Sequence, residues 1–465
     1  MKGILDALPE SLDETYERVL RSINKANRGH ALRLLQCVTV AVRPLRVEEL
    51  AEVLAVDFDA VRNGGIPNLK PDWRWSDQHQ AVLSTCSSLI AIVDDGSSQV
   101  VQFSHFSVKE FLTSDRLACS SGDISRYHIL LSPAHTILAQ ACLGVLLRLD
   151  EHITHGNASE IPLVNYAARF WVDHAQFEDV SSHIQEVMEY FFDAEKPHWA
   201  AWHRVYDKDN HSWSSFTPAS GLTGPVPLYY AALCGFYALA EHLVVKNPEH
   251  AIVRGGRMVT PLVAALSRSH FRVADLLHEH GSDINVRGAW ERTPLHVASC
   301  DGLVDVVRWL LDHGADVNAR NAFSFALLHT HAVLACPEIS RILLEHNADI
   351  VNARDKYGKV PLHWAAMSEG TRDPKGILKT MQLLLDHGAD PNVRDDDGCT
   401  PLHDSSRWKR EGYLTRRGTV EVSRLLLDHG ANIDAENNEG KTPLQSALEA
   451  EYHEMVEFLS GWGAK

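Results

Sequence analysis

The chain has 465 residues, an ordinary hydrophobic content of 45% and a formal net charge of −17. This length predicts several domains, and the composition excludes general disorder. The acidity argues against a general binder of nucleic acid or acidic membranes. The eight cysteines include no Cys-x-x-Cys pair, and no stretch approaches the roughly 20 apolar residues of a membrane span. We therefore expect a cytoplasmic protein in a reducing compartment, without a disulfide or zinc framework.

The first half of the chain predicts short helices around one β-hairpin. Ser11 to Glu14 is a capping box that opens a helix. Further helices are expected at 31–42, 47–54, 80–86 and 107–117. Residues 89–93 and 99–103 read as strands on either side of a polar turn, which is a strong hairpin signal. Several helices with a small hairpin are typical of a winged helix.

The second half repeats one sequence motif six times. Its glycine position falls at Gly281, Gly314, Asn347, Gly388, Gly430 and Gly463, with spacings of 33, 33, 41, 42 and 33. A fixed period of this length indicates a solenoid, in which each unit buries its apolar face against its neighbours.

Each unit reads as two helices. Thr293 is a good N-cap and Pro294 a good first residue for an inner helix. Apolar residues at helical spacing, such as Leu310, then form the core face of an outer helix. Gly314 is expected to end that helix in the left-handed conformation. In the fourth unit Asn347 replaces the glycine, and we expect it to adopt positive φ as well.

These residues resemble the ankyrin family, whose unit is a hairpin turn followed by two antiparallel helices. About seven units are expected over 221–465, of which the first, around Pro227, is degenerate. Two units carry insertions between their helices, at 367–375 and 407–417. Surface loops accommodate such insertions at low cost.

A second resemblance covers most of residues 1–205. The segments 8–16 and 103–112 resemble the part that follows the ATPase core in fungal-type NACHT–ankyrin signalling proteins. The segment from Pro162 to Trp202, which contains Tyr166 to Trp171 and His174, resembles the helical bridge before their repeats. The expected domains are a linker helix at 1–30, a winged-helix-like domain at 31–118 and a helical bridge at 119–220. The resemblance implies that His105 can face a bound nucleotide; the alternative is a histidine that caps or packs.

The sequence holds no P-loop, which needs glycines to cradle phosphate and then Lys and Ser/Thr. Gly440-Lys441-Thr442 mimics its end, but Ala435 stands where the first glycine must be. We interpret this triplet as the hairpin of a repeat. The chain therefore looks like the back half of a signalling switch without its ATPase core: a fragment, a truncated gene model or a shortened relative.

One feature does not follow from the fold. Three residues before the helix caps, successive hairpin tips carry Trp290, Phe323, Tyr357, Asp397 and Glu439. Exposed aromatic clusters usually mark recognition, so we expect these five residues to bind a protein partner. The alternative is that each ring folds back onto its neighbour's hairpin.

No catalytic, metal or cofactor residues are predicted. Most histidines of the repeats lie at two fixed positions, one per unit, whereas metal ligands must converge. The basic insertion at 407–417 could contact an acidic partner or phosphate, but we expect a solvated loop. DNA binding through the winged helix lacks a basic recognition helix, because 107–117 offers only Lys109 and Arg116.

The sequence thus predicts a mainly α fold: a winged-helix-like and helical N-terminal half, followed by an ankyrin-repeat α-solenoid. The predicted function is a non-enzymatic intracellular scaffold for protein–protein interaction. The alternative is the regulatory sensor or lid of a NACHT-type ATPase, whose nucleotide-binding domain is supplied upstream or in trans.

Overall fold

The structure, a computed structural model, forms two compact units. The first comprises residues 1–211 and 225–250, and the second comprises 212–224 and 251–465. The structure describes residues 12–464 apart from 59, 61–64, 75–76, 87, 97, 121, 151, 154–160, 207–225, 257, 323, 335, 368–373, 408, 412–413 and 417–419.

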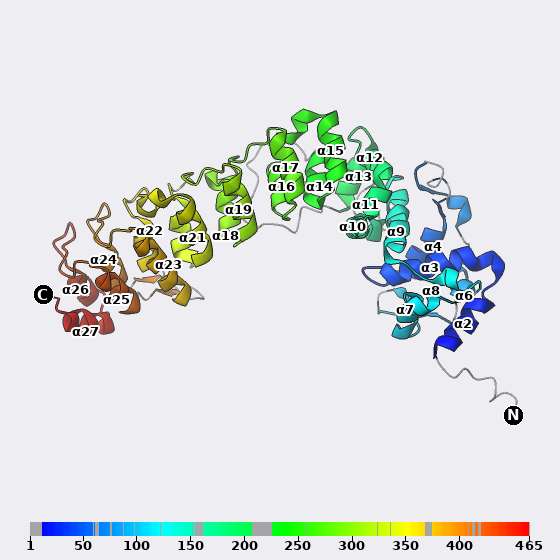
Figure 1. Cartoon of the computed structure of the whole chain (residues 1–465), viewed down its shortest axis with the longest axis horizontal. Helices are drawn as coiled ribbons and strands as arrows, with labels where there is room; N and C mark the ends of the chain where they lie inside the picture. The colour runs from blue at the N-terminus through cyan, green and yellow to red at the C-terminus, as the bar shows by residue number, and fades with distance from the viewer. Residues whose placement is uncertain are drawn as a thin grey trace, which may run out of the picture. The chain divides into compact units, whose positions relative to one another are not determined.

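The first unit begins with helices, labelled in Figure 1, and a small antiparallel sheet. The helices are α2 (Leu12–Ser22), α3 (Arg28–Val40), α4 (Val47–Leu54) and α6 (Gln78–Cys86), with the 3-10 turns η1 (Lys25–Asn27) and η2 (Pro71–Trp73). The sheet has the order β1-β5-β4, made of β1 (Leu45–Arg46), β4 (Ile90–Asp94) and β5 (Gln99–Phe103). A second pair is β2 (Val56–Asp57) with β3 (Asn68–Leu69). The predicted hairpin is confirmed, with Ile92 opposite Val101; β1 was not predicted.

The single helix expected at 107–117 is wrong. Two short helices, α7 (Phe106–Leu112) and α8 (Asp115–Ala118), replace it. The break follows from Ser114, whose hydroxyl accepts a hydrogen bond from the backbone N–H of Leu117 at 3.3 Å and so caps α8. Serine favours this capping role over a helix interior.

The rest of the first unit is helical and centres on aromatic side chains. Its helices are α9 (Leu131–Leu146), α10 (Val164–Ala175), α11 (Val180–His183), α12 (Gln185–Phe191), α13 (Pro197–Val205), α14 (Pro227–Cys234) and α15 (Tyr237–Lys246), with the 3-10 turns η3 (Ser125–Tyr127) and η6 (Pro248–Ala251). Trp171 on α10 contacts Phe191 and Trp202 edge-on, with ring centroids 5.6 and 5.7 Å apart. Both tryptophans are fully buried, so this cluster forms the core of the bridge.

The second unit is a stack of antiparallel helix pairs, as the sequence predicts (Figure 1). The inner helices are α16 (Pro261–Leu266), α18 (Pro294–Cys300), α20 (Leu327–Leu334), α22 (Pro361–Ala366), α24 (Pro401–Ser406) and α26 (Pro443–Glu449). The outer helices are α17 (Phe271–Glu279), α19 (Val304–Asp312), α21 (Pro337–His346), α23 (Pro374–Asp386), α25 (Val420–Asp428) and α27 (His453–Trp462), and the 3-10 turns are η7 (Ala289–Glu291) and η8 (Ala348–Asn352). The core lies between the two rows and includes the fully buried Leu310.

The helix ends confirm the glycine prediction but not its extension to Asn347. Gly314 and Gly388 have φ of 88° and 87°, as the left-handed position requires. Asn347 is instead extended, with φ of −150°. Its side chain accepts the N–H of Asp349 at 3.0 Å, so Asn347 ends α21 without positive φ and at the same time caps η8. Asparagine is among the best N-cap residues, which explains the outcome.

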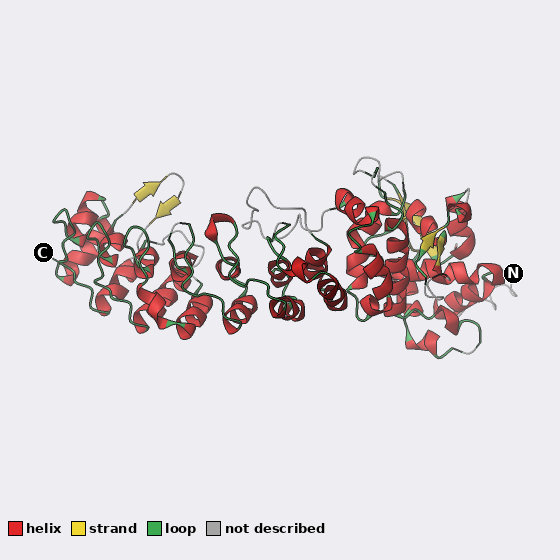
Figure 2. Ribbon diagram, turned by 90° about the horizontal axis from the view of Figure 1, so that it is seen from above, coloured by secondary structure: helices red, strands yellow, loops and turns green. Residues whose placement is uncertain are grey.

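The insertion at 407–417, expected to be a solvated loop, contains two paired strands among its described residues. Strands β6 (Lys409–Glu411) and β7 (Leu414–Arg416) pair antiparallel, with Arg410 opposite Thr415. Figure 2 shows this hairpin extending away from the helices of its repeat. Most of the other insertion, at 367–375, lies outside the described residues, and α23 begins within it at Pro374.

Candidate functional site

Two of the hairpin turns before the inner helices are each built around one aspartate side chain. In the turn that carries Tyr357, Asp355 Oδ1 accepts the N–H groups of Tyr357 at 2.8 Å and Lys359 at 2.9 Å. Asp395 repeats this pattern with Asp397 and Cys399. A carboxylate that accepts two backbone N–H groups fixes the turn and therefore the direction of its tip.

Backbone hydrogen bonds join successive tips. The carbonyl of Trp290 accepts the N–H of Ala322 at 2.9 Å, and the carbonyl of Tyr357 accepts that of Asp396 at 3.1 Å. The carbonyl of Asp397 likewise accepts the N–H of Asn438 at 3.0 Å. These tip residues therefore hold corresponding places along one edge of the stack.

The side chains at this edge are exposed where the structure describes them. Trp290 is 60% exposed and Tyr357 is 51% exposed, and the ammonium of Lys356 lies 4.8 Å from the Tyr357 ring centroid. Asp397 and Glu439 are exposed as well, and Glu439 pairs with Lys441 at 2.9 Å. Phe323 lies outside the described residues. The edge thus offers two large aromatic surfaces followed by two carboxylates.

The turn of Trp290 differs from the others. Gly288 stands where the other turns have Asp355 or Asp395, so no carboxylate organises the backbone there. Trp290 and Glu291 both adopt positive φ, 58° and 56°. A side chain in this region is strained by roughly 1–2 kcal/mol. The Trp290 ring is therefore presented by a different backbone conformation from that of Tyr357.

A row of arginines stabilises the same turns, and the sequence analysis missed it. Arg287 donates to the carbonyl of Arg320 at 2.8 Å, and Arg320 donates to that of Arg354 at 2.5 Å. Arg354 donates to the carbonyl of Arg394 at 2.9 Å. At the start of the row, Arg254 donates to the carbonyl of Arg287. The recurrence of arginine three residues before every tip except Glu439 was the signal that could have revealed this row.

A histidine at the same place in α20, α22 and α24 links neighbouring repeats. His363 Nδ1 accepts the N–H of Val360 at 3.2 Å, and its Nε2 lies 3.1 Å from the carbonyl of Cys399 in the next repeat. His403 makes the same pair of contacts. Since Nδ1 is an acceptor, Nε2 carries the proton and the ring is neutral. Burial lowers the pKa of His363 to about 4.

One cluster in the described part of the chain has the composition of a metal site. His363, Asp395 and Asp404 each place a possible ligand atom within 4.8 Å of the others. Lys359 occupies this place, because its ammonium lies 2.8 Å from Asp395 and 2.5 Å from Asp404. Both ring nitrogens of His363 already take part in hydrogen bonds. The residues therefore do not fit a metal ion and form a buried ion network instead.

His105 caps a helix. Its Nδ1 accepts the N–H of Ser107 at 3.3 Å at the start of α7, and lies 2.6 Å from the Ser107 hydroxyl. Its ring packs on Phe106, with centroids 4.3 Å apart, and Phe106 is 71% exposed. The geometry agrees with the capping alternative.

Gly440-Lys441-Thr442 lies in a hairpin turn, as interpreted from the sequence. Gly440 has φ of 72°, and the Lys441 ammonium pairs with Glu449 at 2.8 Å as well as with Glu439. The Thr442 hydroxyl accepts the N–H of Gln445 at 3.3 Å and so caps α26. The lysine and the threonine therefore both have structural partners.

Comparison with known proteins agrees with both halves of the fold. Residues 16–122 match the family described as the GPI inositol-deacylase winged helix domain. Residues 227–321, 322–395 and 412–465 match ankyrin repeats. The chain combines a winged-helix domain with ankyrin repeats. These matches do not show the resemblance to NACHT–ankyrin proteins.

A similar protein is the "Azaphilone pigments biosynthesis cluster protein L" of Monascus ruber, 30% identical over 301 residues. The match covers 60% of this chain and 61% of that protein. Within the described residues, no helix has both the length and the apolar character needed to cross a membrane.

Proposed function

We propose that this chain is a non-enzymatic interaction module that binds a protein partner along the hairpin tips of its ankyrin repeats. The observation that carries the proposal is the exposure of Trp290 and Tyr357 on turns that are each joined to the next turn by a backbone hydrogen bond. Burying such rings in a partner would release water from a large apolar area, while the rigid turns lose little entropy. Ankyrin repeats as a class act through protein contacts.

The proposed contact strip comprises Trp290, Phe323 and Tyr357, which occupy the same position in three successive units. Stacked helical layers place such positions about 10 Å apart. Asp397 and Glu439 continue the edge and would guide a basic end of the partner.

The test is to isolate a partner by pull-down and then measure its affinity for single alanine variants. Trp290→Ala, Phe323→Ala and Tyr357→Ala should each weaken binding by about 1 kcal/mol or more, with melting temperature unchanged. Trp73→Ala is the control, because Trp73 is an exposed tryptophan (47%) of the winged-helix domain. Variants that lose stability while keeping full affinity would show that the rings are structural.

The alternative function is the regulatory lid of a NACHT-type ATPase. It is favoured by the match to a winged helix of the type found in NACHT-containing proteins, and by the exposed His105–Phe106 pair. Titration calorimetry with ATP–magnesium and with ADP tests it. Saturable binding that His105→Ala abolishes would favour the lid, whereas unchanged binding in that variant would remove His105 from the role.

A further inference from the structure

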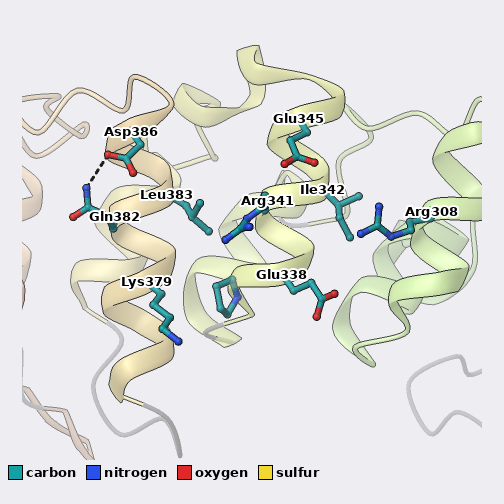
Figure 3. Close-up of a pocket in the computed structure, with 10 residues that line it drawn as sticks. Arg308, Glu338, Arg341, Ile342, Glu345, Lys379, Gln382, Leu383 and Asp386 are labelled. Atoms are coloured by element: carbon teal, nitrogen blue, oxygen red, sulfur yellow. Dashed lines mark hydrogen bonds between the residues drawn. The ribbon is translucent and has the colours of Figure 1, made fainter.

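The outer helices carry a groove on a different face of the repeats from the hairpin tips. It has a volume of about 790 Å³ and lies along α19, α21 and α23 (Figure 3). Its apolar part includes Ile342, which is 7% exposed, and the half-buried Leu383. Six charged side chains line it: Arg308, Glu338, Arg341, Glu345, Lys379 and Asp386.

Five of these six charges have no ion-pair or hydrogen-bond partner among the described residues. The exception is Asp386, which accepts a hydrogen bond from Gln382 at 2.7 Å, as drawn in Figure 3. Partners of opposite sign are available on the same helix, because Glu338 and Glu345 stand three residues before and four after Arg341. The groove therefore keeps charges of both signs free for an external contact.

The balance of positive and negative side chains in the groove indicates what kind of partner it binds. Three cations and three anions give a lining of zero net charge, in a chain whose net charge is −17. A purely acidic or basic partner would meet like charges in it, which is unfavourable. A surface with the same pattern, however, can place each charge against its opposite. Two-fold association of identical subunits supplies such a surface automatically.

We propose that two copies of this chain associate through this groove. The two-fold axis runs along the repeat stack, between the positions of Arg341 and Glu345. It makes the outer helices of the two copies antiparallel, so that Arg341 of each copy faces Glu345 of the other. The apolar surface of Ile342 and Leu383 is covered at the centre of the contact.

Sedimentation velocity of the 465-residue chain tests this proposal directly. The average mass should rise towards that of a dimer as concentration increases, and high salt should oppose the rise because it screens the charges. Arg341→Glu and Glu345→Arg should each weaken association about a hundredfold, since like charges then meet twice across the axis. The double variant R341E/E345R should regain association with itself, yet fail to pair with the wild-type chain.

The controls are Arg268→Glu and Glu454→Arg, exposed residues outside the groove that change the net charge by the same amounts. They should associate like the wild type, and all variants should keep its melting temperature because none of these four side chains has an internal partner among the described residues. A wild-type chain that stays monomeric at every concentration overturns the proposal. A double variant that stays monomeric, or that mixes freely with wild type, overturns the two-fold pairing of Arg341 with Glu345.

Discussion

The hydroxyl of Tyr166 lies 2.9 Å from Nε2 of His174, two turns further along α10. The same hydroxyl accepts the backbone N–H of Val42 at 3.1 Å, and Nδ1 of His174 lies 2.9 Å from Nδ1 of His135 on α9. The guanidinium of Arg43 lies 5.0 Å from the centroid of the Tyr166 ring. This polar chain joins the bridge to the loop after α3, so the Tyr166–His174 segment is an internal connection within the first unit.

Removing the Tyr166 hydroxyl should destabilise the first unit. Tyr166→Phe leaves the buried Nε2 of His174 without its partner and removes the acceptor of the part-buried Val42 N–H, which costs about 1–3 kcal/mol. Urea unfolding followed by tryptophan fluorescence measures the loss. Tyr190→Phe is the control, because Tyr190 is 40% exposed and should unfold as wild type. Equal stability of Tyr166→Phe and wild type would contradict a role for this contact.

The central leucines should stabilise the repeats by packing. Leu310 is fully buried, so Leu310→Ala should cost about 2–5 kcal/mol through lost transfer energy and a cavity. Leu448 is 55% exposed, and Leu448→Ala should change stability far less. Thermal or urea unfolding of both variants distinguishes them. A change within error for Leu310→Ala would contradict its place in the core.

The repeats should lose stability as the pH falls from about 7 towards 4. Burial lowers the folded-state pKa of His296 and of His363 to about 4, whereas unfolded histidine has a pKa near 6.5. Below pH of about 6.5 the unfolded chain binds protons that the folded chain does not, so unfolding becomes easier as pH falls. The loss levels off below the folded pKa. Each such histidine contributes up to about 3 kcal/mol.

His363→Gln isolates this effect, because the last repeat already uses glutamine in the same place. Gln445 Oε1 accepts the N–H of Thr442 at 2.9 Å, which replaces the histidine acceptor. The variant should stay folded at neutral pH and show a shallower dependence of melting temperature on pH. His363→Ala should be less stable at every pH. A glutamine variant with the full wild-type pH dependence would show that His363 does not contribute.

The strained turns should be improved by glycine. Glu291 and Ser324 have φ of 56° and 61° at the position that Gly358 and Gly398 hold in later turns. Glu291→Gly and Ser324→Gly should therefore each raise stability by about 1 kcal/mol. Thermal unfolding is the measurement. Lower stability in both variants would contradict the assigned backbone strain.

The reverse change provides the matched comparison. Gly358 has φ of 73°, and an added Cβ would lie 2.9 Å from the backbone nitrogen of Asp396. Gly358→Ala should therefore destabilise the repeats, since the strained backbone and the close contact act together. An alanine variant as stable as wild type would show that this turn can shift freely.

Local sequence patterns determined the helix pairs, their caps and their core. Thr293 and Pro294 start α18, and Leu310 lies on the core face of α19, so the spacing within each helix identifies their roles. The same reasoning failed at Asn347 and Ser114, where a side chain caps the next element, because capping and helix continuation compete within about 1 kcal/mol.

Only the tertiary structure decided which groups the repeated polar residues contact. Arg320 finds its acceptor at Arg354, and His363 finds its acceptor at Cys399, each one repeat away. Lys359 pairs with Asp404 of the next repeat. Asp404 holds the position there that Trp364 holds in the repeat of Lys359. These partners are fixed by how one repeat stacks on the next, and the spacing of residues within one repeat carries no information about that registration.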